Sequence, residues 1–342
     1  MKKNILVFSN GEKIGDGLIK LPLLNEIKRR LPDRQLIWMT NKGTTVYKNQ
    51  LKNIASQFID EIIEQADLNP FFLQKISNKY DFSNKSFEYI FDTQKTVLRT
   101  IALKRIKCSF FISAAASGLF STVKLQKKSQ QNTRQYYLED LFDLLNLIKT
   151  DQVDRNFKIS LPQTLEIKLG SIFNKNYSYI GFAPGAGEKD KIWPLDNFIK
   201  VVKYFEKKSH KIVFFLGPQE HKIKKKLMSI FPKAFLPEDQ IDEFSGPEIV
   251  MATTKYLSCA LTNDSGISHM LSTNYCPLIK LFGTKDPSKF TPDSPFIKTL
   301  SAKDYNSKDI NSIPTKIVID LIRQEILKDN NSSKRTFRNV QV

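Results

Sequence analysis

Four short segments hold the residues whose types and spacing could do chemistry. They are residues 11–17, 184–194, 216–220 and 262–269. Each follows an apolar run that predicts a buried strand, and each is rich in small or turn-forming residues. Ligands of α/β sheets bind at the turns that follow the carboxyl ends of strands. We therefore interpret the four segments as candidate ligand-binding turns.

The first turn holds one carboxylate, Asp16, among Gly11, Gly15 and Gly17. The glycines leave room for a substrate to approach, and a carboxylate at the start of a helix could accept a proton from an acceptor hydroxyl. Alternatively, Asp16 is a helix cap or first-turn acid that satisfies backbone N–H groups and the helix dipole. The spacing fits neither the Gly-x-Gly-x-x-Gly dinucleotide fingerprint nor a P-loop, which argues against oxidoreductases and nucleotide triphosphatases.

The second turn suits a phosphate group. Gly185 and Ala186 expose backbone N–H groups, and Lys191 could add a compact positive charge. An ordinary Pro-Gly turn with a solvated lysine would have the same composition. In the third turn, Glu220 could accept hydrogen bonds from a ribose, or it could belong to a surface turn.

The fourth turn is the most informative. Asn263 and Asp264 end a predicted strand, and a helix that starts near Ser265 and Gly266 directs unpaired N–H groups toward whatever lies above it. An anion is the expected ligand. His269, one turn into the helix, could donate to a phosphate, and a buried histidine at a helix start is the alternative.

Strands and helices alternate around these turns, which predicts two consecutive doubly wound α/β domains. Apolar runs predict strands at residues 4–8, 35–40, 89–92, 179–183, 212–216, 256–262 and 278–282. Helical spacing appears at residues 18–27, 138–148, 195–208 and 317–327. We expect an amino-terminal domain over residues 1–160, a carboxy-terminal domain over 161–328 whose last helix packs back on the first domain, a linker within 149–176, and a disordered basic tail over 329–342.

The formal charge of +18 is the most prominent feature of the composition. Such a surface attracts nucleic acid, anionic lipid or phosphorylated glycans, although a codon bias that spreads lysines over solvated faces would produce the same charge. The densest basic block, residues 222–226, suits an exposed helix face. A nucleic-acid-binding protein is the non-enzymatic alternative, but interleaved aromatic and basic residues are not obvious.

The composition also bears on the compartment. Three cysteines without a Cys-x-x-Cys pair suggest neither a disulfide framework nor a zinc site. The longest apolar run, residues 110–120, has about half the length of a bilayer-spanning helix. We therefore expect a cytoplasmic protein that does not cross a membrane.

At the four turns the chain resembles glycosyltransferase family 9, which contains the ADP-heptose lipopolysaccharide heptosyltransferases, and it is most similar to the heptosyltransferase II type. The matching residues are Ile14-Gly15-Asp16 with Leu21-Pro22, Phe91-Asp92-Thr93-Gln94, Pro184-Gly185-Ala186 with Lys191-Ile192-Trp193-Pro194, Asn263-Asp264-Ser265-Gly266 with His269, and Phe282-Gly283 with Phe290-Thr291-Pro292.

The resemblance implies a GT-B fold, in which two Rossmann-like domains face each other across a cleft. The donor nucleotide would lie on the second domain and the acceptor on the first. Asp16 falls on the family's general base, Lys191 on its donor-phosphate lysine and Glu220 on its ribose acid. Residues 264–266 fall on its pyrophosphate turn, and Gly15, Gln94 and Lys95 would contact the acceptor. Lys95 departs from the usual glycine, so the acceptor can differ.

These roles predict an inverting transfer of a heptose or related sugar from an ADP-linked donor to a lipopolysaccharide-core or other lipid-linked acceptor. The sequence lacks an Asp-x-Asp pair, so we expect neither a metal nor another cofactor. Partners would be the nucleotide sugar, a phosphorylated glycolipid and, weakly, the anionic inner-membrane surface; nucleic acid is not expected. A related transferase with another donor, or a nucleotide-sugar epimerase or dehydrogenase, is the enzymatic alternative. Sugar, base, linkage and oligomeric state stay open.

Overall fold

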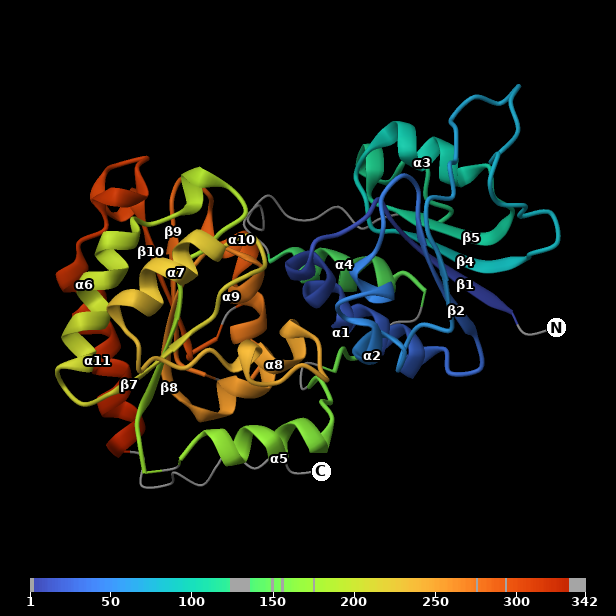
Figure 1. Ribbon diagram of the computed structural model, residues 1–342. Coiled ribbons are helices and arrows are strands. Elements are labelled where there is room, and N and C mark those ends of the chain that lie inside the picture. Colours follow the sequence, from blue (N-terminus) through green and yellow to red (C-terminus); the bar gives the residue numbers. More distant parts are fainter. Residues whose placement is uncertain are drawn as a thin grey trace. The chain divides into compact units, whose positions relative to one another are not determined.

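The computed structural model describes residues 3–123, 136–148, 151–154, 157–174, 176–274, 276–292 and 294–331. The chain forms two compact units, Met1–Phe157 and Lys158–Val342. Each unit contains one parallel five-stranded sheet with helices packed on it (Figure 1). The predicted α/β class is therefore confirmed, with one sheet in each half of the chain.

The first unit has the strand order β3-β2-β1-β4-β5. Its strands are β1 (Asn4–Ser9), β2 (Gln35–Thr40), β3 (Glu61–Ile63), β4 (Phe87–Asp92) and β5 (Cys108–Ser113). Its helices are α1 (Ile14–Arg30), α2 (Lys52–Ala55), α3 (Val97–Lys104) and α4 (Tyr137–Asn146). The strand order reverses beside β1, which pairs with both β2 and β4. The carboxyl ends of β1 and β4 therefore flank the point where such sheets bind ligands.

The second unit has the strand order β10-β9-β8-β6-β7. Its strands are β6 (Tyr179–Ala183), β7 (Lys211–Phe214), β8 (Leu257–Asn263), β9 (Leu278–Phe282) and β10 (Ile297–Ser301). Its helices are α5 (Gln163–Ile172), α6 (Leu195–Glu206), α7 (His221–Ile230), α8 (Gly246–Thr253), α9 (Gly266–Leu271), α10 (Pro287–Phe290) and α11 (Thr315–Asn331). The order reverses beside β6, so the carboxyl ends of β6 and β8 flank the equivalent point.

Both sheets are covered by apolar side chains on two faces, which explains why their strands appear in the sequence as continuous apolar runs. In the second unit, Phe198 and Phe205 of α6 share one core with Val318 and Ile322 of α11. The last helix, expected to pack back on the first domain, thus buries its apolar face in the core of its own unit.

Two expectations concern connecting segments, residues 149–176 for the linker and residues 329–342 for a disordered tail. The polar stretch over residues 149–176, expected to hold the linker, contains helix α5, because Leu165 and Leu169 are one turn apart and both are buried. Residues 329–331, expected to belong to the tail, are instead the end of α11, which continues to Asn331. Residues 332–342 lie outside the described part of the chain.

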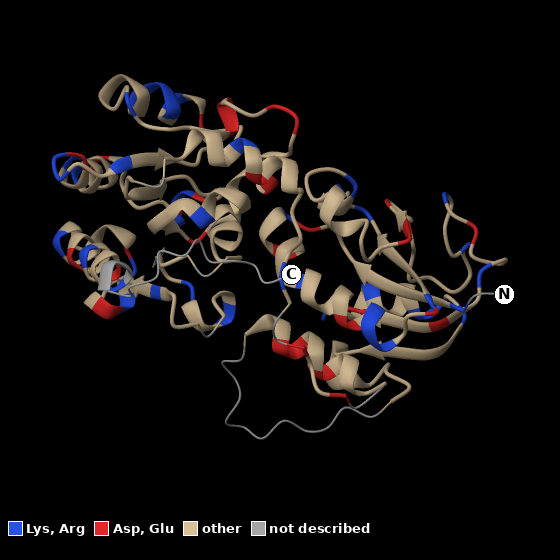
Figure 2. Ribbon diagram, turned by 90° about the horizontal axis from the view of Figure 1, so that it is seen from below, with Lys and Arg blue, Asp and Glu red and all other residues tan. Residues whose placement is uncertain are grey.

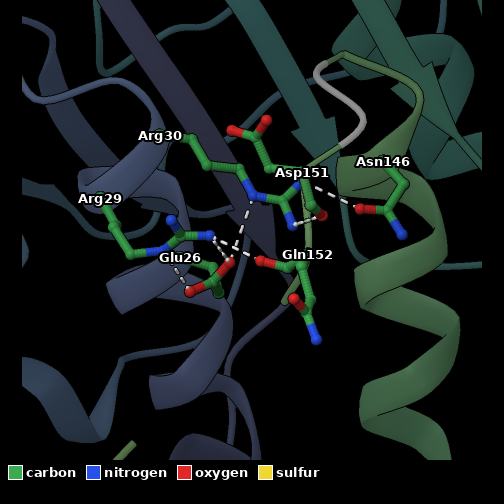
Figure 3. A network of polar contacts seen from close by, with 6 residues as sticks. All are labelled: Glu26, Arg29, Arg30, Asn146, Asp151 and Gln152. Atoms are coloured by element: carbon green, nitrogen blue, oxygen red, sulfur yellow. Dashed lines mark hydrogen bonds and ion pairs between the residues drawn. The ribbon is translucent and has the colours of Figure 1, made fainter. Parts of the chain in front are cut away.

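A polar network fastens the end of α1 to the segment that leaves the first unit (Figure 3). The fully buried Glu26 carboxylate accepts from Arg29 at 2.9 Å and from Arg30 at 3.2 Å. Arg30 also donates to Asn146 Oδ1 and to the Asp151 carbonyl, each at 2.9 Å. The helix that carries Asp16 is therefore held at its far end by α4 and by the exiting chain.

Basic residues occur on elements of both units, with acidic residues between them (Figure 2). The block at residues 222–226 lies on α7, as expected of an exposed helix face, and two of its lysines are paired. Lys224 contacts Asp239 at 2.6 Å and Lys226 contacts Asp196 at 3.0 Å. None of the described helices is both long enough and apolar enough to span a bilayer.

Candidate active site

In the second unit, Asn263 joins the end of β8 to the loop that follows β6. Its side-chain Nδ2 donates to the Pro184 carbonyl at 2.7 Å, and its Oδ1 accepts from the Trp193 backbone N–H at 3.1 Å. Asn263 is fully buried, and both polar ends of its side chain are engaged by backbone. It therefore positions the loop, whereas direct contact with the donor stays a prediction.

The loop places Lys191 beside Asp264. The Lys191 ammonium lies 3.0 Å from the Glu188 carboxylate and 3.6 Å from Asp264 Oδ2. Partial burial opposes its charge, but the bond to Glu188 and the charge of Asp264 prevail, so the pKa of Lys191 lies above its ordinary value. Lys191 is therefore a charged ammonium at neutral pH, held at the carboxyl end of β8.

Helix α9 begins at Gly266, and Ser265 is its N-cap residue. The Ser265 hydroxyl does not cap the helix, and this buried oxygen finds no hydrogen-bond partner among the described residues. The buried Thr291 hydroxyl, which follows α10, is also unpaired within the described chain. An unsatisfied buried hydroxyl costs about 1–3 kcal/mol. Together with the first N–H groups of α9, the Ser265 hydroxyl is suited to a polar ligand.

The fourth turn also contains one nitrogen base, His269. Burial lowers the pKa of His269 well below its ordinary value, and the nearby charges of Lys280 and Lys191 act in the same direction. The imidazole is therefore neutral at pH 7. A neutral imidazole can still donate one hydrogen bond to a phosphate, but it adds no positive charge to the site.

Lys280 is a functional candidate that the sequence analysis missed. It lies in β9 opposite Thr262 of β8, its exposed fraction is 0%, and its ammonium donates to the Phe290 carbonyl at 3.2 Å. Burial lowers the pKa of Lys280 to about 8, while the charge of Asp264 acts against this shift. The sequence does contain a sign of its burial, since Lys280 is the one charged residue in the otherwise apolar run at residues 278–282.

Gly185 and Glu220 lie in direct contact. A Cβ added at Gly185 would lie only 1.3 Å from Glu220 Oε1, and Glu220 Oε2 accepts from the Gly217 N–H at 2.6 Å. Burial raises the pKa of Glu220. Glu220 is thus packed against Gly185, and the partly exposed Ala186 follows Gly185 in the sequence. A contact of Glu220 with a ribose stays a prediction.

A second acid lies near Glu220. Glu238 lies three residues after Phe235, and Phe235 forms a parallel bridge with Val213 of the edge strand β7. Burial raises the pKa of Glu238 to about 8, with smaller contributions from the charges of Asp239 and Glu220. No pattern in the sequence singled out Glu238, because its burial depends on how the chain passes β7.

In the first unit, Asp16 lies exposed in the first turn of α1. The N-cap residue is Lys13, and no side chain caps the helix. The interpretation of Asp16 as a cap is therefore wrong, while the first-turn acid and the general base remain compatible with its position. Gly11, whose φ is +94°, allows a close approach within the chain, since a Cβ there would lie 3.1 Å from the Gly43 Cα. That the glycines leave room for a substrate stays a prediction.

Glu12 and Lys20 form a buried pair of opposite charges below this turn, which the sequence analysis did not identify. The Lys20 ammonium donates to Ser9 Oγ at 2.9 Å, and the Thr45 hydroxyl donates to Glu12. Burial lowers the pKa of Lys20, while the charges of Glu12 and Asp16 act to raise it. A lysine in a helix ordinarily lies in solvent, so its sequence position gave no signal.

The acceptor-side candidates Gly15, Gln94 and Lys95 have different surroundings. Gly15 is buried in α1, and Gln94 is half-buried, with its N–H donated to Asp92 Oδ1 at 2.9 Å. Asp92, buried at the end of β4, also accepts from the Thr100 hydroxyl at 2.6 Å. Lys95 is exposed and contacts Asp140 of α4 at 3.1 Å. A contact of Gly15, Gln94 or Lys95 with an acceptor stays a prediction.

The sequence model of the family described as "Glycosyltransferase family 9 (heptosyltransferase)" matches residues 83–315, which is more than half of the chain. The chain belongs to glycosyltransferase family 9. It is therefore a glycosyltransferase, and the resemblance drawn from the four turns is confirmed.

Solved structures agree on the fold. A family 9 glycosyltransferase from Veillonella parvula superposes with a TM-score of 0.68 at 15% identity, covering 95% of this chain and 97% of that one. The Escherichia coli heptosyltransferase WaaC with ADP gives 0.65 at 14%, covering 94% and 99%. The E. coli ADP-heptose lipopolysaccharide heptosyltransferase II gives 0.65 at 14%, covering 96% and 100%. These structures show the GT-B fold. A search of curated protein sequences found no match.

The fold brings together several predicted site residues that are distant in sequence. Lys191 meets Asp264 at the end of β8, and Glu220 meets Gly185 after β6. Asp16, Gly15 and Gln94 follow β1 and β4, the strands at the reversal point of the first sheet. Each unit thus carries its candidate residues at the edge where α/β sheets bind ligands.

Proposed function

We propose that this family 9 glycosyltransferase moves a heptose or a related sugar from an ADP-linked donor to a lipopolysaccharide-core or other lipid-linked glycan. The donor part of the proposal is supported by the likeness to WaaC, whose structure contains ADP. Another nucleotide sugar on the same fold is the alternative.

One observation carries the donor site: the Lys191 ammonium lies beside Asp264 at the carboxyl end of β8, and the buried Lys280 pairs in register with Thr262 of the same strand. Lys191 lies 3.6 Å from Asp264, and the fully buried Lys280 is close enough for the Asp264 charge to influence its pKa. A buried cation is costly unless it meets an opposite charge. A diphosphate would supply more negative charge than Asp264 alone, and the Ser265 hydroxyl would gain a partner.

The reaction would be a single displacement with inversion. Asp16 accepts the proton of the acceptor hydroxyl, the hydroxyl oxygen bonds to the anomeric carbon, and the bond from that carbon to the diphosphate oxygen breaks. The nucleoside diphosphate leaves with the electron pair of that bond. Asp16 suits the base role because it is exposed and caps no helix.

The leaving diphosphate needs its growing charge stabilised. We propose that Lys191 and Lys280 provide this stabilisation without a metal ion, because fixed charges that are already in place require no reorganisation. Full activity in excess EDTA is expected. If EDTA abolished turnover and Mg²⁺ restored it, this assignment would be wrong.

On the acceptor side, we propose a phosphorylated glycolipid reached from the cytoplasmic face of the membrane. Gln94 would contact the glycan, and the basic surface would attract anionic groups. Transfer to a phosphorylated core glycolipid that exceeds transfer to its dephosphorylated form supports the proposal. Equal rates on the two acceptors contradict it.

The donor proposal is tested by the thermal stability of the protein with ADP, UDP, GDP or CMP. A selective rise in Tm with ADP is expected, because only a nucleotide bound by the folded state stabilises it. The same rise should be lost in Lys191→Met but kept in Lys200→Met, an exposed lysine of α6. A rise with UDP or GDP alone identifies the alternative donor.

A further inference from the structure

Three consecutive apolar side chains stand in solvent on the first unit. Phe71, Phe72 and Leu73 have exposed fractions of 64%, 79% and 102%. In Figure 1 they belong to the light-blue loop beside α3 that extends away from the sheet of its own unit. Scattered exposed apolar residues are ordinary, but a contiguous group at a loop tip marks an interaction site.

The loop is held in this shape by its own hydrogen bonds. Leu68 and Ser77 form an antiparallel bridge at its base, and the Asn69 N–H donates to the Ile76 carbonyl at 3.3 Å. Nearer the tip, the Gln74 N–H donates to the Phe71 carbonyl at 3.2 Å. The apolar tip is therefore part of a closed loop.

Arg105, just after α3, braces both sides of the loop. Its guanidinium donates to the Asn69 carbonyl at 2.9 Å and to Asn69 Oδ1 at 2.6 Å, and also to the Gln74 carbonyl. It lies 5.9 Å from the Phe72 ring. Such bracing keeps the tip from folding back to bury its own apolar side chains.

Basic side chains outnumber acidic ones in and beside this loop, where the exposed Asp67 and Asp81 come before and after it in the sequence. Lys75 lies two residues beyond Leu73, Lys79 follows the bridge, and Arg105 braces the loop. Among the described residues, no carboxylate lies within ion-pair distance of these three cations. An apolar tip with Lys75 and Arg105 beside it complements a bilayer whose surface carries anionic headgroups.

We propose that residues 71–73 insert into the headgroup region of an anionic bilayer while Lys75, Lys79 and Arg105 contact lipid phosphates. A second copy of the chain is a poorer occupant, because three side chains offer roughly 500 Å² at most, whereas a stable protein interface needs about 800 Å² on each partner. The inference requires neither the donor nor the acceptor proposed above. Insertion of the apolar tip would add a salt-resistant component to membrane binding, which the basic charge alone would make purely electrostatic.

The first test measures cosedimentation of the full chain with vesicles of phosphatidylglycerol and phosphatidylethanolamine. The triple variant Phe71→Ser/Phe72→Ser/Leu73→Ser should bind about 100-fold more weakly, since partial burial of three large apolar side chains is lost. The matched control Ile167→Ser/Leu327→Ser removes apolar side chains that are 67% and 57% exposed on α5 and α11. It should bind like the wild type.

Salt separates the two components of binding. At 1 M NaCl the wild type should keep measurable vesicle binding while the triple variant keeps none, because salt screens charges and leaves apolar burial intact. Equal binding by wild type and triple variant, at low and at high salt, would overturn the proposal.

The second test reports insertion directly. Both native tryptophans, Trp38 and Trp193, are fully buried, so a tryptophan introduced by Phe72→Trp reports on the tip. Its emission should shift to the blue with anionic vesicles and be quenched by lipids brominated near the headgroup. Absence of quenching refutes insertion. If the wild type instead sediments as a dimer without lipid and the triple variant as a monomer, the tip binds a second copy.

Discussion

Replacement of Lys280 by methionine should make the protein more stable and its donor affinity weaker. Lys280 is fully buried in β9, and burial lowers its pKa from 10.5 to about 8. At 1.36 kcal/mol for each pKa unit, charging this side chain costs the folded state about 3 kcal/mol at pH 7. The bond to the Phe290 carbonyl returns about 1 kcal/mol. Lys280→Met should therefore gain roughly 2 kcal/mol, because methionine is similar in volume and carries no charge.

The sign of the pH dependence follows from proton linkage. A lysine with a lowered pKa destabilises the folded state fully below about pH 8, and this penalty disappears as the pH rises to 10.5, since the unfolded state binds more protons within that window. The charge of Asp264 acts on Lys280, and the charge of Lys280 in turn lowers the pKa of His269. The stability advantage of Lys280→Met over wild type should therefore shrink between pH 8 and pH 10.5.

Urea denaturation of the wild type and of Lys280→Met at pH 7 and pH 10 measures the difference in stability. Calorimetric titration with ADP measures the affinity for ADP, which should fall about tenfold in the variant. The control is Lys298→Met in the neighbouring strand β10, a partly exposed lysine, for which both effects should be small. A Lys280→Met protein that is less stable than wild type at pH 7, or that binds ADP equally well, would refute the reasoning.

Three further predictions concern other parts of the site and its support. Asp16→Asn should lower kcat by about 10²–10⁴-fold with donor affinity little changed, and steady-state kinetics showing near-normal turnover would exclude Asp16 as the base. Gly185→Ala should weaken ADP binding at least about tenfold, because its Cβ would displace the Glu220 carboxylate. Gly217→Ala is its control, since there the nearest atom would lie 3.7 Å away, and equal ADP affinities of the two variants would contradict the expected clash. Glu26→Gln should lower the free energy of unfolding by about 3 kcal/mol, because Arg30 would stay buried without its carboxylate partner. An unchanged urea midpoint would show that Asn146 and the Asp151 carbonyl suffice to hold Arg30.

The sequence was sufficient to identify most strands and the turns that follow them. Apolar runs such as residues 35–40 correspond to β2 residue for residue, because a strand covered on both faces must be apolar along its length. The turn at residues 262–269 was recognisable because its small residues, its acid and its helix start are adjacent in the chain. The short edge strand β3 was missed, since three residues are too few to establish a period.

Only the tertiary structure decided which side chains are buried together and in which charge state. Glu12 and Lys20 gave no sign of burial, because a lysine or glutamate has the same local pattern whether it lies in solvent or in a core. Lys280 lies in an apolar run, but the run alone did not determine its charge state. The contact of Lys191 with Asp264 and that of Gly185 with Glu220 depend on the strand order β7-β6-β8-β9. Strand order is set by packing between segments far apart in the chain, and local periodicity does not determine that packing.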